Sequence, residues 1–539
     1  MASLKEKFVE ELEYLRRLGR VFARRNPGLE AFLGASAKDA GVQRLLEGFA
    51  FLTARLRLKI DDDFPEITQP LLQDQDPTCL QPTPSMTIMR FTPIEGALTA
   101  PHRVPRATVV QSRRVQGVRC QFRTCTDVTL LPLAIESIRD SHSPDSSLLR
   151  VTLLASPGTS LHTLDCDQLA FHLSGSEDIA LMLYGWLGRH LQEIRMECDD
   201  RQHTLPAHNV EFSGFAPNEA LLPQARGKLD GYRILQEYFC YPSRFHFFRL
   251  TGLHGLWPAR PCQRAILEFR FNRAMPDGSR VTNADLALFC TPAINLFPAK
   301  SPAISLETPR LGFALEPAGP GSAGSREIFS VDGVSCARRA TTAEGVSPVP
   351  DFRRYSSACH PLLEREEGFY RHEISDHLLH EGLAHHVSLL RGDGTAYVAS
   401  DEIAQVSLTC TDGQLPASLL PGDIAYQADT TTDLAEFINI TVPTKAWSPE
   451  LGGDHPWRWI SNLSPNYLTL GNVEALAGFL RVYDLPGLRD VQLARATHRK
   501  LGAIRSISTS PVERMFKALP VRGIHTVSYT HLTLPTKRI

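Results

Sequence analysis

Residues 360–386 hold the densest group of ionisable side chains in the sequence. After position 370 this group consists of His372, Glu373, Asp376, His377, His380, Glu381, His385 and His386. A zinc hydrolase of the H-E-x-x-H type needs two histidines four residues apart on one helix face. Here His385 follows His380 by five positions, about 140° further round a helix. Other pairs do have a spacing of four. A solvated histidine-rich segment is therefore favoured, and a metal-dependent hydrolase using residues 360–386 is the alternative.

Two further patterns could carry chemistry. Gly319, Gly321 and Gly324 spell G-x-G-x-x-G, but Pro320 interrupts the motif and a β-like run follows it, so a loop or linker is favoured over a dinucleotide site. The 11 cysteines include no Cys-x-x-Cys pair, which favours reduced, buried thiols over a zinc centre. The sequence therefore assigns no catalytic residue, no cofactor and no resident metal.

The first 75 residues predict two amphipathic helices. Leu4, Phe8, Leu12, Leu15 and Phe22 follow one face of the first, which Asn26-Pro27 should end. The second should begin after Asp39 and end at Pro65, with apolar residues repeating at spacings of three and four. Its apolar series is Val42, Leu45, Leu46, Phe49, Leu52, Leu56 and Ile60. Such helices form a hairpin or an arm that packs on a partner.

From about residue 80 short β-rich runs predominate, as at 87–91, 120–124, 149–154 and 265–271. One helix is expected at 179–190 and another at 476–482. We therefore predict an α+β, multi-domain chain, with an N-terminal helical region followed by sandwich- or barrel-like β-rich domains and few helices. The expected divisions are 1–75 helical, 76–315 β-rich, 316–326 linker, 327–450 β-rich, 451–523 incomplete α/β and 524–539 non-native tail.

Residues 238–248, YFCYPSRFHFF, are densely aromatic. A buried strand edge is the favoured interpretation, and an interface anchor is the alternative, because aromatic residues and Arg dominate binding hot spots. The residues chosen as candidate protein contacts are Phe8, Leu12, Leu15, Phe22, Phe49, Phe245 and Phe247.

Several long strings, taken in order, resemble one family. They include ELEYLRRLGRVFA at 11–23 and WRWISNLSPNYL at 457–468, together with 42–55, 59–65, 82–86, 122–124, 238–248, 290–297 and 326–332. The chain resembles the TssF (VasA, ImpG) family of type VI secretion baseplate subunits over about residues 5–523.

This resemblance implies a structural role without catalysis or cofactor. Members join TssG in a wedge, two copies to one, and contact TssE and TssK. The spike is a further candidate partner. The wedges support sheath and tube assembly in a contractile, phage-tail-like machine. The implied location is cytoplasmic, in a baseplate docked at the inner-membrane complex. A carbohydrate-binding β-module is a third reading, with only the β-rich texture behind it.

The C-terminal residues depart from the family pattern. The family continues beyond 521–523 with an alternating strand and a helical region, whereas this chain ends IHTVSYTHLTLPTKRI, which looks like translated adapter sequence. We therefore expect residues 524–539 to be foreign and the native C-terminal region to be missing.

Composition excludes other classes. The 539 residues carry 57 Lys plus Arg and 59 Asp plus Glu, a formal net charge of −2, which argues against bulk nucleic-acid binding. No run approaches the roughly 18 apolar residues of a membrane span. The start, MASLKEKFVEEL, has no apolar core of a signal peptide, so we expect a cytoplasmic protein with no direct membrane insertion.

Overall fold

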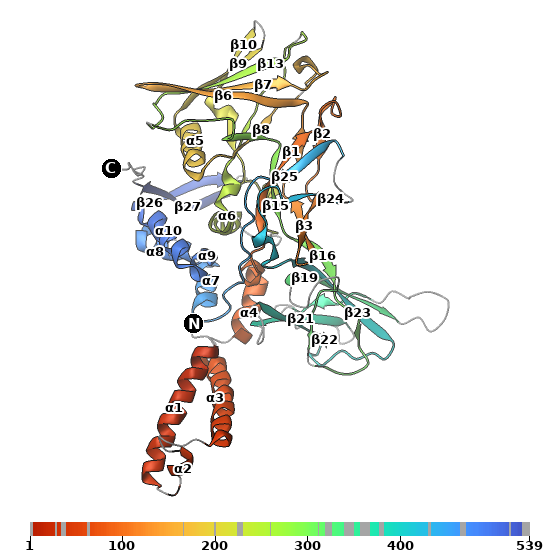
Figure 1. Ribbon diagram of the computed structural model, residues 1–539, viewed down its shortest axis with the longest axis vertical. Coiled ribbons are helices and arrows are strands. Elements are labelled where there is room, and N and C mark those ends of the chain that lie inside the picture. The colour runs from red at the N-terminus through yellow and green to blue at the C-terminus, as the bar shows by residue number, and fades with distance from the viewer. Residues whose placement is uncertain are drawn as a thin grey trace. The chain divides into compact units, whose positions relative to one another are not determined.

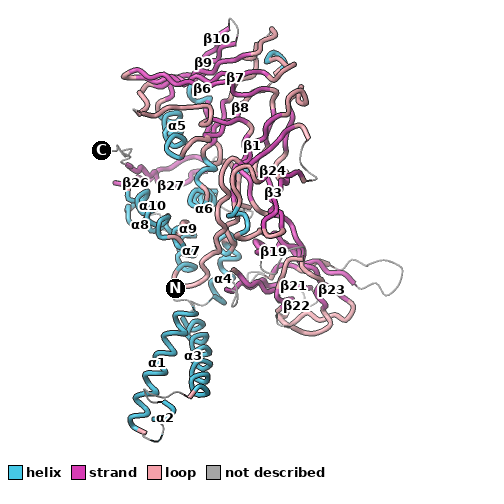
Figure 2. Tube along the Cα trace, in the orientation of Figure 1, coloured by secondary structure: helices cyan, strands magenta, loops and turns pink. Residues whose placement is uncertain are grey.

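The chain divides into two compact units, Met1–Leu80 with Glu450–Gly471, and Gln81–Pro449 with Asn472–Ile539. The computed structural model describes residues 4–26, 28, 30–33, 39–61, 65–164, 166–198, 201–223, 230–258, 260–276, 278–310, 312–318, 326–338, 350–355, 367–376, 382–428, 433–463, 471–516 and 519–530. Figure 2 separates the helical segments from the strands by colour.

The first unit is helical. Its elements are α1 (Leu4–Arg25), α2 (Glu30–Leu33), α3 (Ala40–Asp61), α4 (Pro65–Gln75), the 3-10 turn Pro77–Leu80 and α7 (His455–Leu463). α1 ends two residues before Pro27, as predicted. Asp39 caps α3, because its Oδ1 accepts hydrogen bonds from the amides of Gly41 (2.8 Å) and Val42 (3.2 Å). Pro65 opens α4, in keeping with the preference for Pro in the first turn of a helix, and α4 packs against α7.

The second unit begins with a six-stranded sheet, in the order β24-β3-β4-β15-β1-β25. Its strands are β1 (Met86–Pro93), β3 (Val109–Val115), β4 (Val118–Thr124), β15 (Cys290–Ile294), β24 (Ile424–Gln427) and β25 (Ala435–Asn439). Asn439 joins the two end strands, since its carbonyl accepts from the amide of Gly422 (2.9 Å) and its Oδ1 from that of Ile424 (2.9 Å). The sheet thus curls toward a barrel.

Two more sheets share the main hydrophobic core with this one. The five-stranded sheet, order β10-β9-β13-β7-β6, contains β6 (Leu133–Ser143), β7 (Ser146–Ala155), β9 (Leu191–Cys198), β10 (Arg201–Pro206) and β13 (Arg264–Phe271). The four-stranded sheet, order β11-β12-β8-β14, contains β8 (Leu169–Leu173), β11 (Val210–Phe212), β12 (Phe247–Leu250) and β14 (Leu286–Leu288). The predicted strand at 265–271 is β13, and the predicted helix at 179–190 is α5 (Glu177–Arg189).

A second β-rich core lies around two four-stranded sheets. One contains β16 (Phe297–Lys300), β17 (Ile304–Ser305), β19 (Glu327–Arg338) and β23 (Glu402–Thr411). The other contains β18 (Phe313–Ala314), β20 (Arg353–Arg354), β21 (Gly368–Asp376) and β22 (Leu383–Arg391). Residues on both sides of the expected linker 316–326 share this core, whereas β24 and β25 return to the six-stranded sheet. The division at 327–450 therefore does not follow the sheets.

The remaining elements complete the second unit. They are α6 (Asp230–Cys240), α8 (Val473–Arg481), α9 (Leu485–Arg489), α10 (Val491–Gly502), the pair β2 (His102–Val104) with β5 (Val128–Leu130), and the hairpin β26 (Ile504–Phe516) with β27 (Leu519–Thr530). The predicted helix at 476–482 is α8. β27 includes the first seven residues of the expected foreign tail and pairs Ile524 with Pro511; their origin stays a prediction, and residues 531–539 lie outside the described residues. Helices and sheets together confirm the α+β class.

Candidate protein-interaction surfaces

α1 and α3 form an antiparallel hairpin (Figure 1). Ion pairs join Glu11 to Arg57 and Arg16 to Glu47, the latter at 3.8 Å, so the chain runs in opposite directions in the two helices. Three alanines, Ala23, Ala50 and Ala54, are buried in this unit. Small side chains permit a close approach of two helices, so the hairpin has a packing face of its own.

α3 carries a second apolar face that the chain leaves exposed. Leu45, Phe49, Leu52 and Leu56 expose 76%, 62%, 55% and 63% of their surface. Their spacing of four, three and four is that of a coiled-coil seam. At 100° per residue they fall within about 60° of one another, roughly 120° round the helix from Leu46, Ala50 and Ala54.

α1 repeats this arrangement. Tyr14, Leu18 and Phe22 expose 50%, 50% and 51%, and they lie roughly 100° from the face that holds Leu15, Gly19 and Ala23. The seven exposed residues on the two helices are called the apolar stripe.

Both halves of the apolar stripe lie on one side of the hairpin. Each half is displaced from its packing face in the same rotational sense, and in an antiparallel pair equal displacements reach the same side. Arg16 and Glu47 are displaced in the opposite sense and pair with each other, which confirms the geometry on the other side. One side of the hairpin is therefore apolar over about 17 Å of α3, from Leu45 to Leu56.

The structure separates the candidate contacts on these helices. Phe8, Leu12 and Leu15 are partly buried, on the side of α1 that carries Ala23. Phe22 and Phe49 belong to the apolar stripe, whereas Leu45, Leu52 and Leu56 were in the predicted helix but not among the chosen residues. Their signal was available, because the apolar positions of α3 are too many for a single face.

The aromatic segment supplies core residues. Phe245 and Phe247 are each 7% exposed. Phe247 starts β12, between β8 and β11, and its ring centroid lies 4.5 Å from that of His172. Phe245 lies below two half-exposed rings, 5.4 Å from Phe215 and 6.2 Å from Tyr238. These two candidate contacts thus lie inside the chain, in keeping with the strand-edge interpretation.

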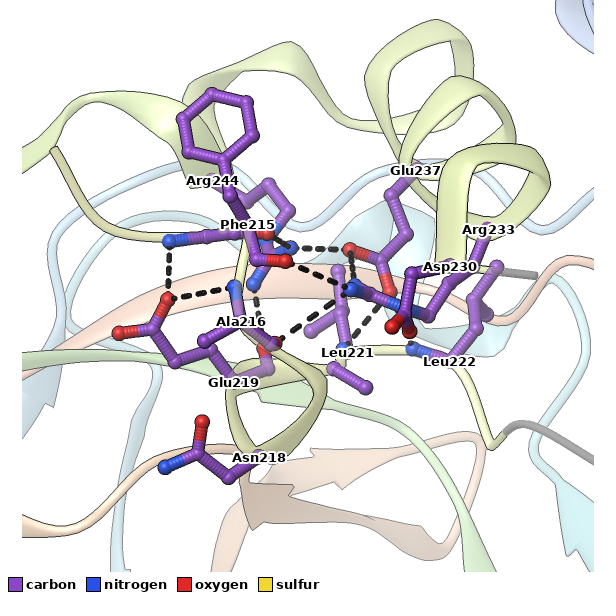
Figure 3. A network of polar contacts seen from close by, with 12 residues as sticks. Phe215, Ala216, Asn218, Glu219, Leu221, Leu222, Asp230, Arg233, Glu237 and Arg244 are labelled. Carbon is purple, nitrogen blue, oxygen red and sulfur yellow. Dashed lines mark hydrogen bonds and ion pairs between the residues drawn. The ribbon is translucent and has the colours of Figure 1, made fainter. Parts of the chain in front are cut away.

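A buried ionic network lies beside this segment (Figure 3). Glu237, on α6, is fully buried. Its Oε1 accepts hydrogen bonds from the amides of Leu221 (2.9 Å) and Leu222 (3.1 Å), and its Oε2 accepts from Arg233 Nη1 (3.1 Å) and Arg244 Nη1. Burial lowers the pKa of Arg244, and the Glu237 carboxylate opposes that shift.

The same network holds the loop at 213–222. Arg244 Nη1 donates to the carbonyl of Gly214 (2.8 Å), and Glu219 Oε2 accepts from the amide of Gly214 (2.5 Å). Arg249 pairs with Glu219 at 2.8 Å. The opposite charges are matched within the chain, so the network fixes a loop against α6 and offers no unsatisfied charge to a substrate.

The histidine-rich segment forms two strands where it is described. His372 on β21 and His385 on β22 lie diagonally across the pair, with His372 Nε2 and His385 Nδ1 2.9 Å apart. Desolvation lowers the pKa of His372 to about 3 and that of His385 to about 4. His385 is only 4% exposed. The expected solvated segment is therefore wrong for the described residues, because cross-strand pairing buries it.

This imidazole pair does not have the geometry of a metal chelate. The ring planes differ by 10° and their centroids are 5.2 Å apart, so most of that separation is the N···N contact and the rings meet edge to edge. An ion on that line would need about 2.0–2.1 Å on each side. The described residues hold no group of three His, Cys, Asp or Glu able to bind a metal; His360, His377, His380 and Glu381 lie outside them.

The cysteines and helices exclude two other kinds of site. The ten cysteines in the described residues are buried, and desolvation raises the pKa of the Cys120, Cys125 and Cys240 thiols to about 12. Within the described ranges no helix is sufficiently long and apolar to span a bilayer.

Comparisons with known proteins agree with the resemblance. The family model "Type VI secretion system, TssF" matches residues 1–530. Type VI secretion system component TssF1 of Pseudomonas aeruginosa is 29% identical over 579 residues, covering 96% of this chain and 88% of that protein. A chain in a cryo-electron microscopy structure of a TssK-TssF-TssG baseplate subcomplex superimposes with a TM-score of 0.73 and 26% identity, over 90% of this chain and 89% of that one.

A second solved structure supports the fold. A chain of a type VI secretion baseplate complex gives a TM-score of 0.64 at 24% identity, covering 97% of this chain and 89% of that one. The family match spans the helical hairpin, the sheets and most of the terminal β-hairpin. The chain therefore belongs to the type VI secretion system TssF family and is a component of that system's baseplate.

Proposed function

We propose that this chain acts by assembly, as the subunit that joins a TssG-like and a TssK-like protein in a baseplate wedge. The observation that carries the proposal is the likeness, at a TM-score of 0.73 over 90% of the chain, to a protein solved in a TssK-TssF-TssG subcomplex. No catalytic step is proposed, since the charged groups of the buried network neutralise one another.

The apolar stripe supports an assembly role. Seven large apolar side chains, each at least half exposed, lie together on one side of the helical hairpin. Exposed apolar patches of this kind mark protein–protein contacts. Phe22 and Phe49 are the candidate contacts from the sequence that belong to it, and we propose that they are buried when the wedge forms.

Further contacts follow from the family resemblance. We propose a second copy of this chain in each wedge, contact with a TssE-like subunit and with the spike, and a cytoplasmic baseplate docked at the inner-membrane complex. These contacts would use surfaces of the β-rich unit.

Co-expression tests the proposal. The chain should be produced with the TssG-like and TssK-like subunits of its own system and fractionated by size exclusion, with subunit ratios from native mass spectrometry. We expect one stable complex containing all three subunits. Separate elution of this chain at every subunit ratio would overturn the proposal.

A further inference from the structure

The border of the apolar stripe is basic. Arg17 lies one residue before Leu18, Arg25 lies three residues after Phe22, and Arg44 and Arg55 directly precede Leu45 and Leu56. All four arginines are exposed. Arg17 also lies over the ring of Tyr14, with 6.0 Å to the centroid.

These cations have no acidic partner within the described part of the chain. The ion pairs of the hairpin use Arg16 and Arg57 instead. Residues 16–47 contain seven basic residues, Arg16, Arg17, Arg20, Arg24, Arg25, Lys38 and Arg44, against three acids, Glu30, Asp39 and Glu47. This excess stands in a chain whose formal net charge is −2.

Favourable interaction with the helix dipole explains only part of this pattern. Cations are stabilising in the last turn of a helix, which accounts for Arg24 and Arg25. Arg17 lies two turns earlier, and Arg44 lies near the start of α3, where the dipole disfavours a cation. The remaining reason to keep these charges beside an apolar seam is a partner that answers them.

We infer that the apolar stripe receives a helix from a different subunit whose apolar seam is bordered by Asp and Glu. The inference rests on the proposed function and adds the chemistry of the partner. The coiled-coil spacing of Leu45, Phe49, Leu52 and Leu56 selects a helix, since each knob enters a hole formed by four residues of the facing helix. The basic border selects acidic flanks, as charges beside a seam do in coiled coils.

The same charges disfavour a second copy of this chain on the stripe. Two hairpins packed stripe to stripe would bring two basic borders together, with Glu10 as the nearest acid on each border by helical position. Like charges across an interface suppress a wrong partner. A second copy in the wedge should therefore use another surface.

The test uses the full chain and two fluorescent three-heptad helical peptides of roughly 21 residues. The peptides share one leucine seam and differ only in flanking residues, Glu in one and Lys in the other. Binding is measured by anisotropy between about 0.05 M and about 0.5 M salt. We expect the Glu peptide to bind roughly tenfold more tightly at low salt, with a gap that narrows as salt screens the charges.

Matched variants separate the seam from its border. The border variant Arg17→Glu, Arg55→Glu should reverse the preference, whereas Arg20→Glu, on the other side of α1, should not. The seam variant Phe49→Gln should weaken both peptides, whereas Phe51→Gln should not. Phe51 is also exposed (44%) but lies away from the stripe, so folding losses common to exposed substitutions are controlled.

Several outcomes would overturn the inference. Equal binding of the two peptides at low salt would remove the acidic partner. Dimerisation of the chain that Leu45→Gln abolishes would assign the stripe to a second copy. Binding of phosphatidylglycerol vesicles, lost in the border variant while neither peptide binds, would assign it to a lipid surface. A stable three-subunit complex insensitive to the border variant would refute the inference and leave the proposed function intact.

Discussion

Substitution of Glu237 by Gln should strongly destabilise the loop at 213–222. Glu237 is fully buried, and its carboxylate accepts four hydrogen bonds, two from amides and two from arginines. Gln keeps the volume and one acceptor oxygen, but its NH2 group would face two guanidinium donors. Arg233 and Arg244 would be left buried without this counter-charge.

The expected cost follows from the burial of these groups. Removing one member of a buried ion pair costs about 3–5 kcal/mol. Since 1.36 kcal/mol corresponds to a factor of ten, local opening should become roughly two to three orders of magnitude more frequent. Native-state hydrogen exchange of the Leu221 and Leu222 amides, which Glu237 holds directly, is the assay because it reports this loop without requiring the whole chain to unfold in one step.

Two further variants make the result decisive. Glu211→Gln removes a carboxylate that is 54% exposed and 3.8 Å from Arg249, and should cost less than about 1 kcal/mol. The double variant Glu237→Gln, Arg244→Met should cost less than the two single changes combined, because it removes both buried charges. If Glu237→Gln protects the loop amides as well as Glu211→Gln does, the network is not what fixes the loop.

Three other predictions concern groups elsewhere in the fold. His372 and His385 are neutral in the fold but protonate in the unfolded chain below its pKa of about 6.5, so stability should fall as pH drops from 6.5 toward 4, by about 2 kcal/mol at pH 5 for one such histidine; denaturation midpoints of His372→Gln, His385→Gln should depend less on pH, and an unchanged slope would contradict the burial. Gly252→Ala places a Cβ 2.4 Å from Asn209 Nδ2 at φ +75°, whereas Gly255→Ala at φ +74° meets nothing within 4 Å, so thermal unfolding should show about 1–3 kcal/mol more loss for the first and equal losses would refute the clash. Cys125 and Cys240 should resist a thiol reagent until the protein unfolds, because burial raises the pKa of both to about 12; rapid labelling in the native protein would contradict this.

Local signals in the sequence predicted the elements well. Pro27 and Asp39 mark the end of α1 and the start of α3, because a residue before Pro avoids the helical region and an Asp side chain can accept from free amides. The alternating run at 265–271 gave β13. The order of strings resembling the TssF family was confirmed by the family match.

Long-range pairing was not readable from the sequence. β25 pairs with β1 across more than 300 residues, with Phe437 opposite Phe91, and no local pattern encodes that register. The same limit explains the histidine segment, whose burial depends on β21 and β22 meeting. Composition alone also could not tell which aromatic residues of 238–248 face outward.

The expected foreign tail stays a prediction. The family match reaches residue 530 and β27 pairs along its length, but strand pairing does not establish origin. Resequencing the locus tests it: reads that diverge at codon 524 would support the prediction, and an in-frame stop directly after Ile539 would contradict it.

The most direct test of assembly through the hairpin is the molar mass of the complex with the TssG-like subunit, by size exclusion with light scattering. The wild type, the stripe variant Leu45→Gln, Phe49→Gln and the control Phe51→Gln are compared at equal concentration. Loss of the complex only in the stripe variant is the predicted result. A complex of unchanged mass and stability in the stripe variant would contradict the account.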